Sequence, residues 1–190
     1  MAICEFLISQ DVTVNCSSPL HEGVEPLAFI INKADIASVS QTGSTVDDIK
    51  LKTGKQAYQI QQIGRQPFNG TNDSMEEGDL RNTINKVVSF AIMQNGPDVS
   101  DKVINGLLNG EFIIIIENKS KNDTDKNAFE VIGLDMGARC TSLTRNMYEN
   151  MASYMVEMTE AGTPNAPIFF WDTDYTTTRG KVEALLTPAT

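Results

Sequence analysis

The sequence has few of the side chains that carry most enzyme and metal chemistry. Its 190 residues include one histidine and three cysteines. The histidine, His21, lies in the Pro- and Gly-bearing segment SPLHEGVEP, and no second histidine exists to complete a His-based metal site or a Ser–His–Asp triad. These shortages predict a protein that is not an enzyme, with no catalytic residue, no metal site and no cofactor.

The cysteine count also bears on the compartment. Cys4, Cys16 and Cys140 are odd in number and form no CxxC pair, which argues against a disulfide framework or a zinc ribbon and indicates a reducing compartment. The N-terminal stretch MAICEFLISQD has no basic segment, and Glu5 interrupts its short apolar run. We therefore expect neither a signal peptide nor a membrane span there.

Positive charge is scarce. The 15 Lys and Arg residues stand against 25 Asp and Glu residues, so the formal net charge is −10. An acidic chain repels phosphate, which argues against a surface that grips DNA or RNA. The hydrophobic content of 41% over 190 residues is enough for one domain with a core, and we expect a single domain over residues 1–190.

Short apolar segments rich in β-branched and aromatic residues run through most of the chain, with Gly, Pro, Asn and Asp between them. This pattern predicts strands and a mainly β fold. The expected strands are residues 27–33, 47–52, 57–63, 86–93, 112–116, 128–134 and 153–159. For residues 86–93, a helix that begins near Asp79 is the competing interpretation.

One helix is predicted from Ser100 to Asn109. Ser100 is a suitable N-cap residue and Gly110 a suitable stop. Val103 and Leu107 are four residues apart, as are Ile104 and Leu108. On a helix these four residues form one apolar stripe. We expect this stripe to pack on a sheet. The tail, residues 177–186, fits either a short helix or an edge strand.

Two further segments are polar and irregular. Residues 64–80 are acidic and too long for an ordinary turn, so we expect one long loop that is functional or partly disordered. Residues 1–26 are more polar than a strand requires, and we expect an N-terminal arm that reaches a neighbouring molecule.

The stretch GEFIIIIENKSKNDTDKNAFEVIGLDMG raises the question of a calcium site. Asp123, Asp125 and Asn127 have the 1-3-5 spacing of an EF-hand loop. The sixth position, however, is Ala128 instead of Gly, and the twelfth is Leu134 instead of a carboxylate. The stretch therefore predicts a hairpin with a solvated tip. Its four consecutive isoleucines predict a central strand with both faces buried.

The segment GLDMG, within the same stretch, raises the question of a phosphate loop. No Lys-Ser/Thr pair follows it and no GxGxxG motif is present, so the sequence argues against phosphate binding. We expect Gly133 and Gly137 to adopt positive φ at a strand end or bulge. Cys140, which has no histidine near it in sequence, is expected to be a small core residue.

Three consecutive aromatic residues, Phe169, Phe170 and Trp171, lie in APIFFWDTDY. An alternating strand would expose at least one of them, and exposed aromatic side chains mark interfaces. The alternative is that all three are buried at a corner between a strand and a loop.

The order of these segments resembles the tail-tube-type structural proteins of phages and prophages of gut Bacteroidetes. The resemblance extends over residues 27–175. Its most specific parts are LLNGEFIIIIENK and AFEVIGLDMGARCTSLTRN. The resemblance implies a tail-tube-like β-sandwich or partly closed barrel with one flanking α-helix.

The same resemblance implies a virion protein of the tail, assembled in the cytoplasm of the bacterial host. Copies would form a homo-oligomeric ring, usually hexameric, and rings would stack into a tube for genome passage beside other tail or connector proteins. DNA would pass without specific binding, because a negative lumen wall repels it; a basic wall would contradict this explanation. No membrane partner is expected.

Contact residues follow from this resemblance as expectations. The loop over residues 64–80 would contact the next ring. The candidate contact residues in that loop are Arg65, Phe68, Asn69, Glu76 and Glu77. Residues 169–171 would form an aromatic cluster between subunits. Two alternatives remain open: a tail terminator or head–tail connector ring, and a monomeric ligand-binding β-barrel with this aromatic cluster in its pocket.

Overall fold

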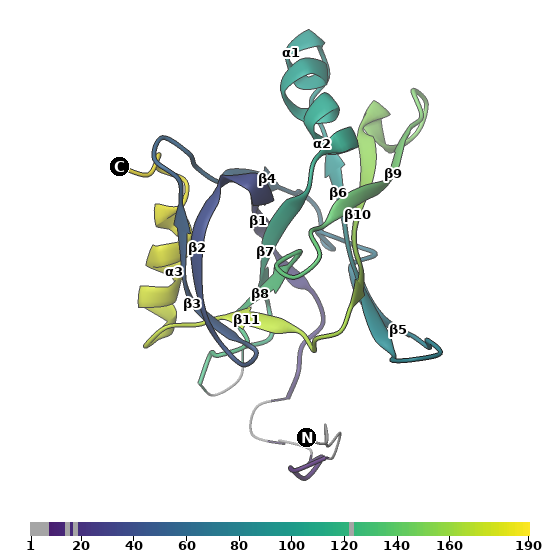
Figure 1. Ribbon diagram of the computed structural model, residues 1–190. Helices are drawn as coiled ribbons and strands as arrows, with labels where there is room; N and C mark the ends of the chain where they lie inside the picture. Colours follow the sequence, from purple (N-terminus) through teal and green to yellow (C-terminus); the bar gives the residue numbers. More distant parts are fainter. Residues whose placement is uncertain (1–7, 14–15, 17–18, 122–123) are drawn as a thin grey trace.

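Two β-sheets form the body of the protein in the computed structural model, which describes residues 8–13, 16, 19–121 and 124–190 (Figure 1). The strands are β1 (Val24–Asn32), β2 (Ile36–Thr42), β3 (Thr45–Leu51), β4 (Tyr58–Gln61), β5 (Asn72–Glu76), β6 (Thr83–Ile92), β7 (Phe112–Asn118), β8 (Phe129–Ile132), β9 (Arg139–Arg145), β10 (Tyr154–Thr163) and β11 (Ile168–Phe170). The large sheet has the order β2-β3-β11-β8-β7-β1-β4, and the small sheet has the order β5-β6-β10-β9. The mainly β prediction is confirmed, as a sandwich of two sheets that do not close into a barrel.

Strand β7 lies inside the large sheet, between β1 and β8. Ile113 and Ile115 pack in a core beneath the C-terminal helix, whereas Ile114 and Ile116 pack in a second core between the two sheets. All four are at most 2% exposed. The prediction of a central strand with both faces covered is therefore confirmed, and β8 is its expected return strand.

The helices are α1 (Pro97–Val99), the π-helical turn η2 (Ser100–Ile104), α2 (Asn105–Asn109) and α3 (Tyr175–Ala184), with the 3-10 turns η1 (Lys33–Asp35) and η3 (Asn150–Ala152). The elements α1, η2 and α2 are continuous in sequence and join β6 to β7. The helix predicted to begin at Ser100 therefore exists but begins three residues earlier, at Pro97. The tail is a helix: the Asp174 side chain caps α3 by accepting a hydrogen bond from the Thr177 N–H at 2.8 Å.

The expected packing of the first helix on a sheet is wrong for half of its stripe. Leu107 is buried, but Val103 and Leu108 are exposed by 40% and 55%. The reason is position: the helix projects beyond the ends of the strands, and only its last turn lies against β9 (Figure 1).

The prediction of one long loop over residues 64–80 is also wrong, because β5 lies within it and pairs with β6 as a hairpin. Strand β5 has the sequence NDSME and all five of its residues are exposed. It has no apolar alternation because, as an edge strand, it buries neither face.

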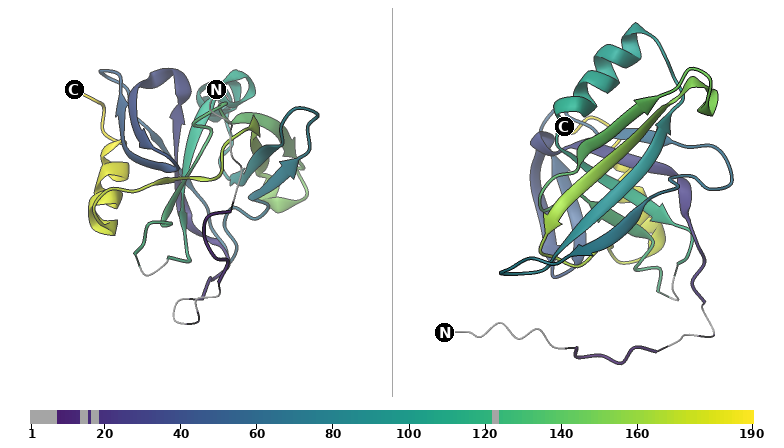
Figure 2. Two further views of the ribbon diagram at one scale, coloured as in Figure 1. Left: turned by 60° about the horizontal axis from the view of Figure 1, so that its bottom comes forward. Right: turned by 90° about the vertical axis from the view of Figure 1, so that its right-hand side faces the viewer.

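The N-terminal arm is shorter than expected, since β1 begins at Val24. Its described residues 8–13 lie away from the sheets (Figure 2).

Candidate functional site

The small sheet has one uncovered face. Lys86, Val88 and Phe90 of β6 point toward the large sheet and are buried. The register places the intervening positions on the opposite face, where no helix covers the strands (Figure 2, right). Residues on this outer face are Asn72, Ser74, Glu76, Thr83, Asn85, Val87, Ser89, Ala91, Arg139, Ser142, Thr144, Met155, Glu157 and Thr159. It is a flat, polar surface with no lysine.

Among the described residues, β5 and β9 are the edge strands of the small sheet, and only the start of β9 is engaged: Ala138, directly before it, forms an antiparallel bridge with Phe112 of β7. All three pairings in this sheet are antiparallel, so β5 and β9 run in opposite directions. Their charges are opposite as well: β5 contains Asp73 and Glu76, and β9 contains Arg139 and Arg145. Arg139 pairs with Glu111, yet its side chain is 65% exposed.

The five residues expected to contact a next ring fall into two groups. Arg65 and Asn69 are exposed in the loop between β4 and β5, while Glu76 and Glu77 lie at the β5–β6 hairpin turn. Phe68 is only 4% exposed and packs in the core between the sheets, so its side chain offers no contact surface. The structure does not bring the five together, because β5 separates the two groups.

The three aromatic residues 169–171 do not form one surface cluster. Strand β11 lies inside the large sheet between β3 and β8, and its side chains alternate between the two faces. Phe170 is buried beneath α3, whereas Phe169 and Trp171 are half-buried. Of the three aromatic side chains, Phe170 alone is fully buried, so the alternative in which all three are buried at a corner holds for Phe170 only.

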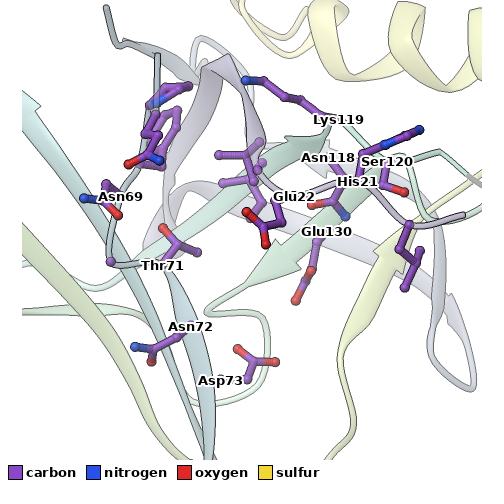
Figure 3. A pocket seen from close by; sticks show the side chains of 18 of the residues that line it. His21, Glu22, Asn69, Thr71, Asn72, Asp73, Asn118, Lys119, Ser120 and Glu130 are labelled. Atoms are coloured by element: carbon purple, nitrogen blue, oxygen red, sulfur yellow. The ribbon is translucent and has the colours of Figure 1, made fainter. Parts of the chain in front are cut away.

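A cavity of about 650 Å³ lies between the sheets, at the end near β5. Its walls come from residues 20–24, from the loop before β5 and from the base of the β7–β8 hairpin. Figure 3 shows Glu22, Asp73 and Glu130 presented to this space from the segment before β1, from β5 and from β8 respectively. Amide side chains such as Asn118 and the rim cation Lys119 complete the lining, which is polar and acidic.

Glu130 is the most perturbed carboxyl group of this cavity. Burial raises its pKa to about 7, and the negative charge of Asp73 adds to this effect. Lys86 and a hydrogen bond from Asn118 act in the opposite direction but do not cancel it. Near neutral pH, Glu130 is therefore divided between its charged and neutral forms.

Behind the cavity lies a buried ion pair that sequence reasoning missed. Lys86 and Glu160 are 0% and 1% exposed, and the Lys86 Nζ lies 4.0 Å from Glu160 Oε2. Among the described residues, this Nζ has no hydrogen-bond partner. The signal in the sequence was the alternation of Val156 and Met158, which places Glu160 on the same inward face two residues later.

The turn formed by the segment GLDMG, residues 133–137, holds the Glu160 carboxylate. It accepts hydrogen bonds from the backbone N–H groups of Gly133, Asp135 and Met136 at 2.8, 3.0 and 2.9 Å. Gly133 has a φ of 89°, and a Cβ there would lie 2.2 Å from the Phe112 carbonyl oxygen. The segment GLDMG is thus an anion-binding turn, but its anion is the chain's own carboxylate.

Metal-ligating side chains do not cluster in the described part of the chain. The described residues contain no group of three His, Cys, Asp or Glu side chains able to hold a metal ion, and Asp123 lies outside them. His21 is exposed at the cavity rim. Cys140 is half-buried, and this burial raises the pKa of its thiol, which disfavours the reactive thiolate.

No helix in the described part of the chain is long and apolar enough to cross a membrane. No protein-family model, curated protein or solved structure matches this chain.

Proposed function

We propose that this chain is a virion structural protein, a tail tube or tail ring subunit, that assembles with copies of itself through the edges of its small sheet. The observation that carries the proposal is the small sheet itself. Its two edge strands have opposite direction and opposite charge, and no other described segment covers its polar outer face. The resemblance of the sequence to tail-tube-type proteins supports the same function.

Strand directions determine how copies fit together. When β5 of one copy lies beside β9 of the next, with both sheets in the same orientation, the new pair is antiparallel like the pairs within the sheet. Through Val87 and Thr159, the register places Asn72 level with Arg139, so β5 extends beyond the start of β9. An offset of about four residues along the strands brings Glu76 of one copy opposite Arg139 of the next. Repeating this offset contact about an axis inclined to the strands produces a closed ring. Main-chain pairing of this kind is the usual mode of β-augmentation.

The outer face of the small sheet becomes the lumen wall in such a ring. Its charged register positions are Glu76, Glu157 and Arg139, and Arg139 is paired with Glu111. Because Arg139 is paired with Glu111, Glu76 and Glu157 leave the wall mildly negative, and its register positions contain no lysine. DNA phosphates find little cationic charge to bind there, so the genome passes without specific contacts. The acidity of the chain lies mostly on other surfaces.

The ends of the small sheet favour a stacking subunit over a single terminator or connector ring. Tyr148 and Met151 are 98% and 79% exposed in the turn between β9 and β10. At the opposite end, Leu80 is fully exposed in the β5–β6 turn. Apolar side chains at both ends provide material for contacts between rings. A ligand-binding barrel is not favoured, because the sheets do not close and residues 169–171 do not line the cavity.

Light scattering after size-exclusion chromatography, with negative-stain microscopy of the same fractions, tests this function. The proposal expects ring-shaped particles with a central hole, and stacks of them at high protein concentration. A connector or terminator would give rings that never stack. A protein that stays monomeric at high concentration would refute assembly by its own sheet edges.

A further inference from the structure

Asp73 and Glu130 belong to different sheets but face the same space. Asp73 is the register partner of Lys86, whose side chain points inward. Glu130 is the register partner of Ile116, which packs in the core between the sheets. Both carboxyl groups line the same cavity (Figure 3). Two acidic side chains thus line one cavity, one from the edge strand β5 and one from the large sheet.

The surrounding charges leave this pair poorly compensated. Lys86, from β6, is the buried cation of the cluster, and its ion-pair partner is Glu160 of β10. Glu160 is itself held by three backbone N–H groups. Around the cavity rim, the charged or titratable side chains are His21, Glu22, Arg65 and Lys119. Three inward carboxyl groups therefore share one buried ammonium group.

Strand β5 is weakly held in other respects. Within the described residues its only strand partner is β6, and each of its five residues is exposed, so it buries no apolar side chain. Strands with few buried contacts open at low free-energy cost. A change in the charge of a facing group therefore has a large relative effect on β5.

We propose that Asp73 and Glu130 form a pH-sensitive latch that controls how firmly β5 docks onto the sandwich. When Glu130 is protonated, it presents a neutral carboxyl group to Asp73 and β5 stays docked. When Glu130 loses its proton, two like charges face each other at the cavity and β5 with its hairpin loosens. The device acts on an edge strand, so it alters local order without unfolding the cores.

The direction of the effect follows from linkage. The pKa of Glu130 is about 7 in the docked structure, raised by burial and by Asp73, against an ordinary value of 4.5 when the strand is open. The docked state thus holds a proton that the open state releases. Docking is strongest below the ordinary pKa and weakens as pH rises toward about 7. Between pH 6 and pH 8 this predicts an approximately tenfold loss of docking.

Amide hydrogen exchange of the full chain, corrected for the intrinsic pH dependence of exchange, tests the latch. We expect protection of residues 72–76 to fall about tenfold from pH 6 to pH 8, while protection of β7 stays constant. Glu130→Gln is expected to abolish the fall and keep β5 protected at pH 8. The matched control is Glu157→Gln, which removes an exposed carboxylate from the outer face and is expected to behave as the wild type.

Two results would overturn the latch. One is equal protection of residues 72–76 at both pH values in the wild type. The other is a fall in Glu130→Gln as large as that in the wild type. Asp73→Asn provides an independent check, because removing the facing charge is expected to shrink the fall in the same way. Ring formation would pair β5 with β9 of a neighbouring copy and protect the same amides, so the exchange is measured at a protein concentration at which light scattering shows monomers.

Discussion

Replacement of Glu160 by Ala is expected to be among the most destabilising single changes in the protein. The side chain is 1% exposed and accepts three backbone hydrogen bonds. Its removal leaves three N–H groups without an acceptor and the Lys86 ammonium buried without a counter-ion. Breaking a buried pair in this way costs about 3–5 kcal/mol of unfolding free energy. That is a large part of the roughly 5–15 kcal/mol by which a whole domain is typically stable.

The partner substitution is expected to behave differently. Lys86→Met removes an ammonium that makes no hydrogen bond within the described chain and lies 4.0 Å from its ion-pair partner. Glu160 keeps its three N–H donors, and the desolvation cost of the ammonium disappears. The unfolding free energy should therefore stay within about 1 kcal/mol of the wild-type value.

Urea unfolding followed by the fluorescence of Trp171, the single tryptophan, and by far-UV circular dichroism measures both changes. The double variant Glu160→Ala/Lys86→Met separates the unpaired ammonium from the unsatisfied N–H groups. A loss below about 1 kcal/mol for Glu160→Ala would contradict the reasoning, because this is less than one unsatisfied buried group costs. An equal loss for Lys86→Met would contradict it too.

Two further predictions concern Glu130 and two glycines. Because the pKa of Glu130 is about 7 in the native state, the contribution of this group to the unfolding free energy should fall by ~2 kcal/mol as pH rises from about 4.5 to about 7. Glu130→Gln should remove this fall in urea titrations across that pH range. Identical pH profiles for the variant and the wild type would contradict the prediction. Gly133→Ala should lower the thermal midpoint, because the added Cβ would lie 2.2 Å from a backbone oxygen. Gly106→Ala, whose added Cβ would have nothing within 4 Å, should raise the unfolding free energy by about 0.5–1 kcal/mol. Calorimetry that shows both variants stabilised, or both destabilised, would contradict this difference.

The sequence was informative wherever burial leaves a periodic trace. Four isoleucines in a row predicted β7 as a strand with both faces covered, and the two cores on either side of it confirm this. Apolar residues spaced four apart predicted the first helix, but Ser100, the expected N-cap, lies inside it, and Gly96 is the N-cap. The same pattern did not reveal that Val103 and Leu108 are exposed, because periodicity defines a stripe but not what covers it.

The features that periodicity missed depend on contacts between distant segments. Strand β5 carries no apolar alternation, since an edge strand is held by main-chain bonds to β6. Phe68, a single aromatic in a polar loop, was read as a surface residue but fills the core between the sheets. The anion that residues 133–136 bind is Glu160, more than twenty residues further along the chain, so no local motif reports it.

A charge-swap mixing experiment tests the central claim, assembly of the small sheet edge to edge, most directly. Glu76→Lys makes the β5 edge more basic, so it would face another basic β9 edge; Arg139→Glu makes the β9 edge more acidic, so it would face another acidic β5 edge. Each variant alone is expected to assemble far less than the wild type. In a 1:1 mixture, the basic β5 edge of Glu76→Lys can pair with the acidic β9 edge of Arg139→Glu. The unchanged acidic β5 edge of Arg139→Glu can then pair with the unchanged basic β9 edge of Glu76→Lys.

Light scattering of the two variants, separately and mixed at low ionic strength, gives the decisive comparison. The account predicts monomers or small species from each variant alone and rings with alternating copies from the mixture. Raised salt should weaken the difference, because these side chains are exposed. Full assembly of each variant alone, or no recovery in the mixture while the wild type forms rings, would contradict pairing between β5 and β9.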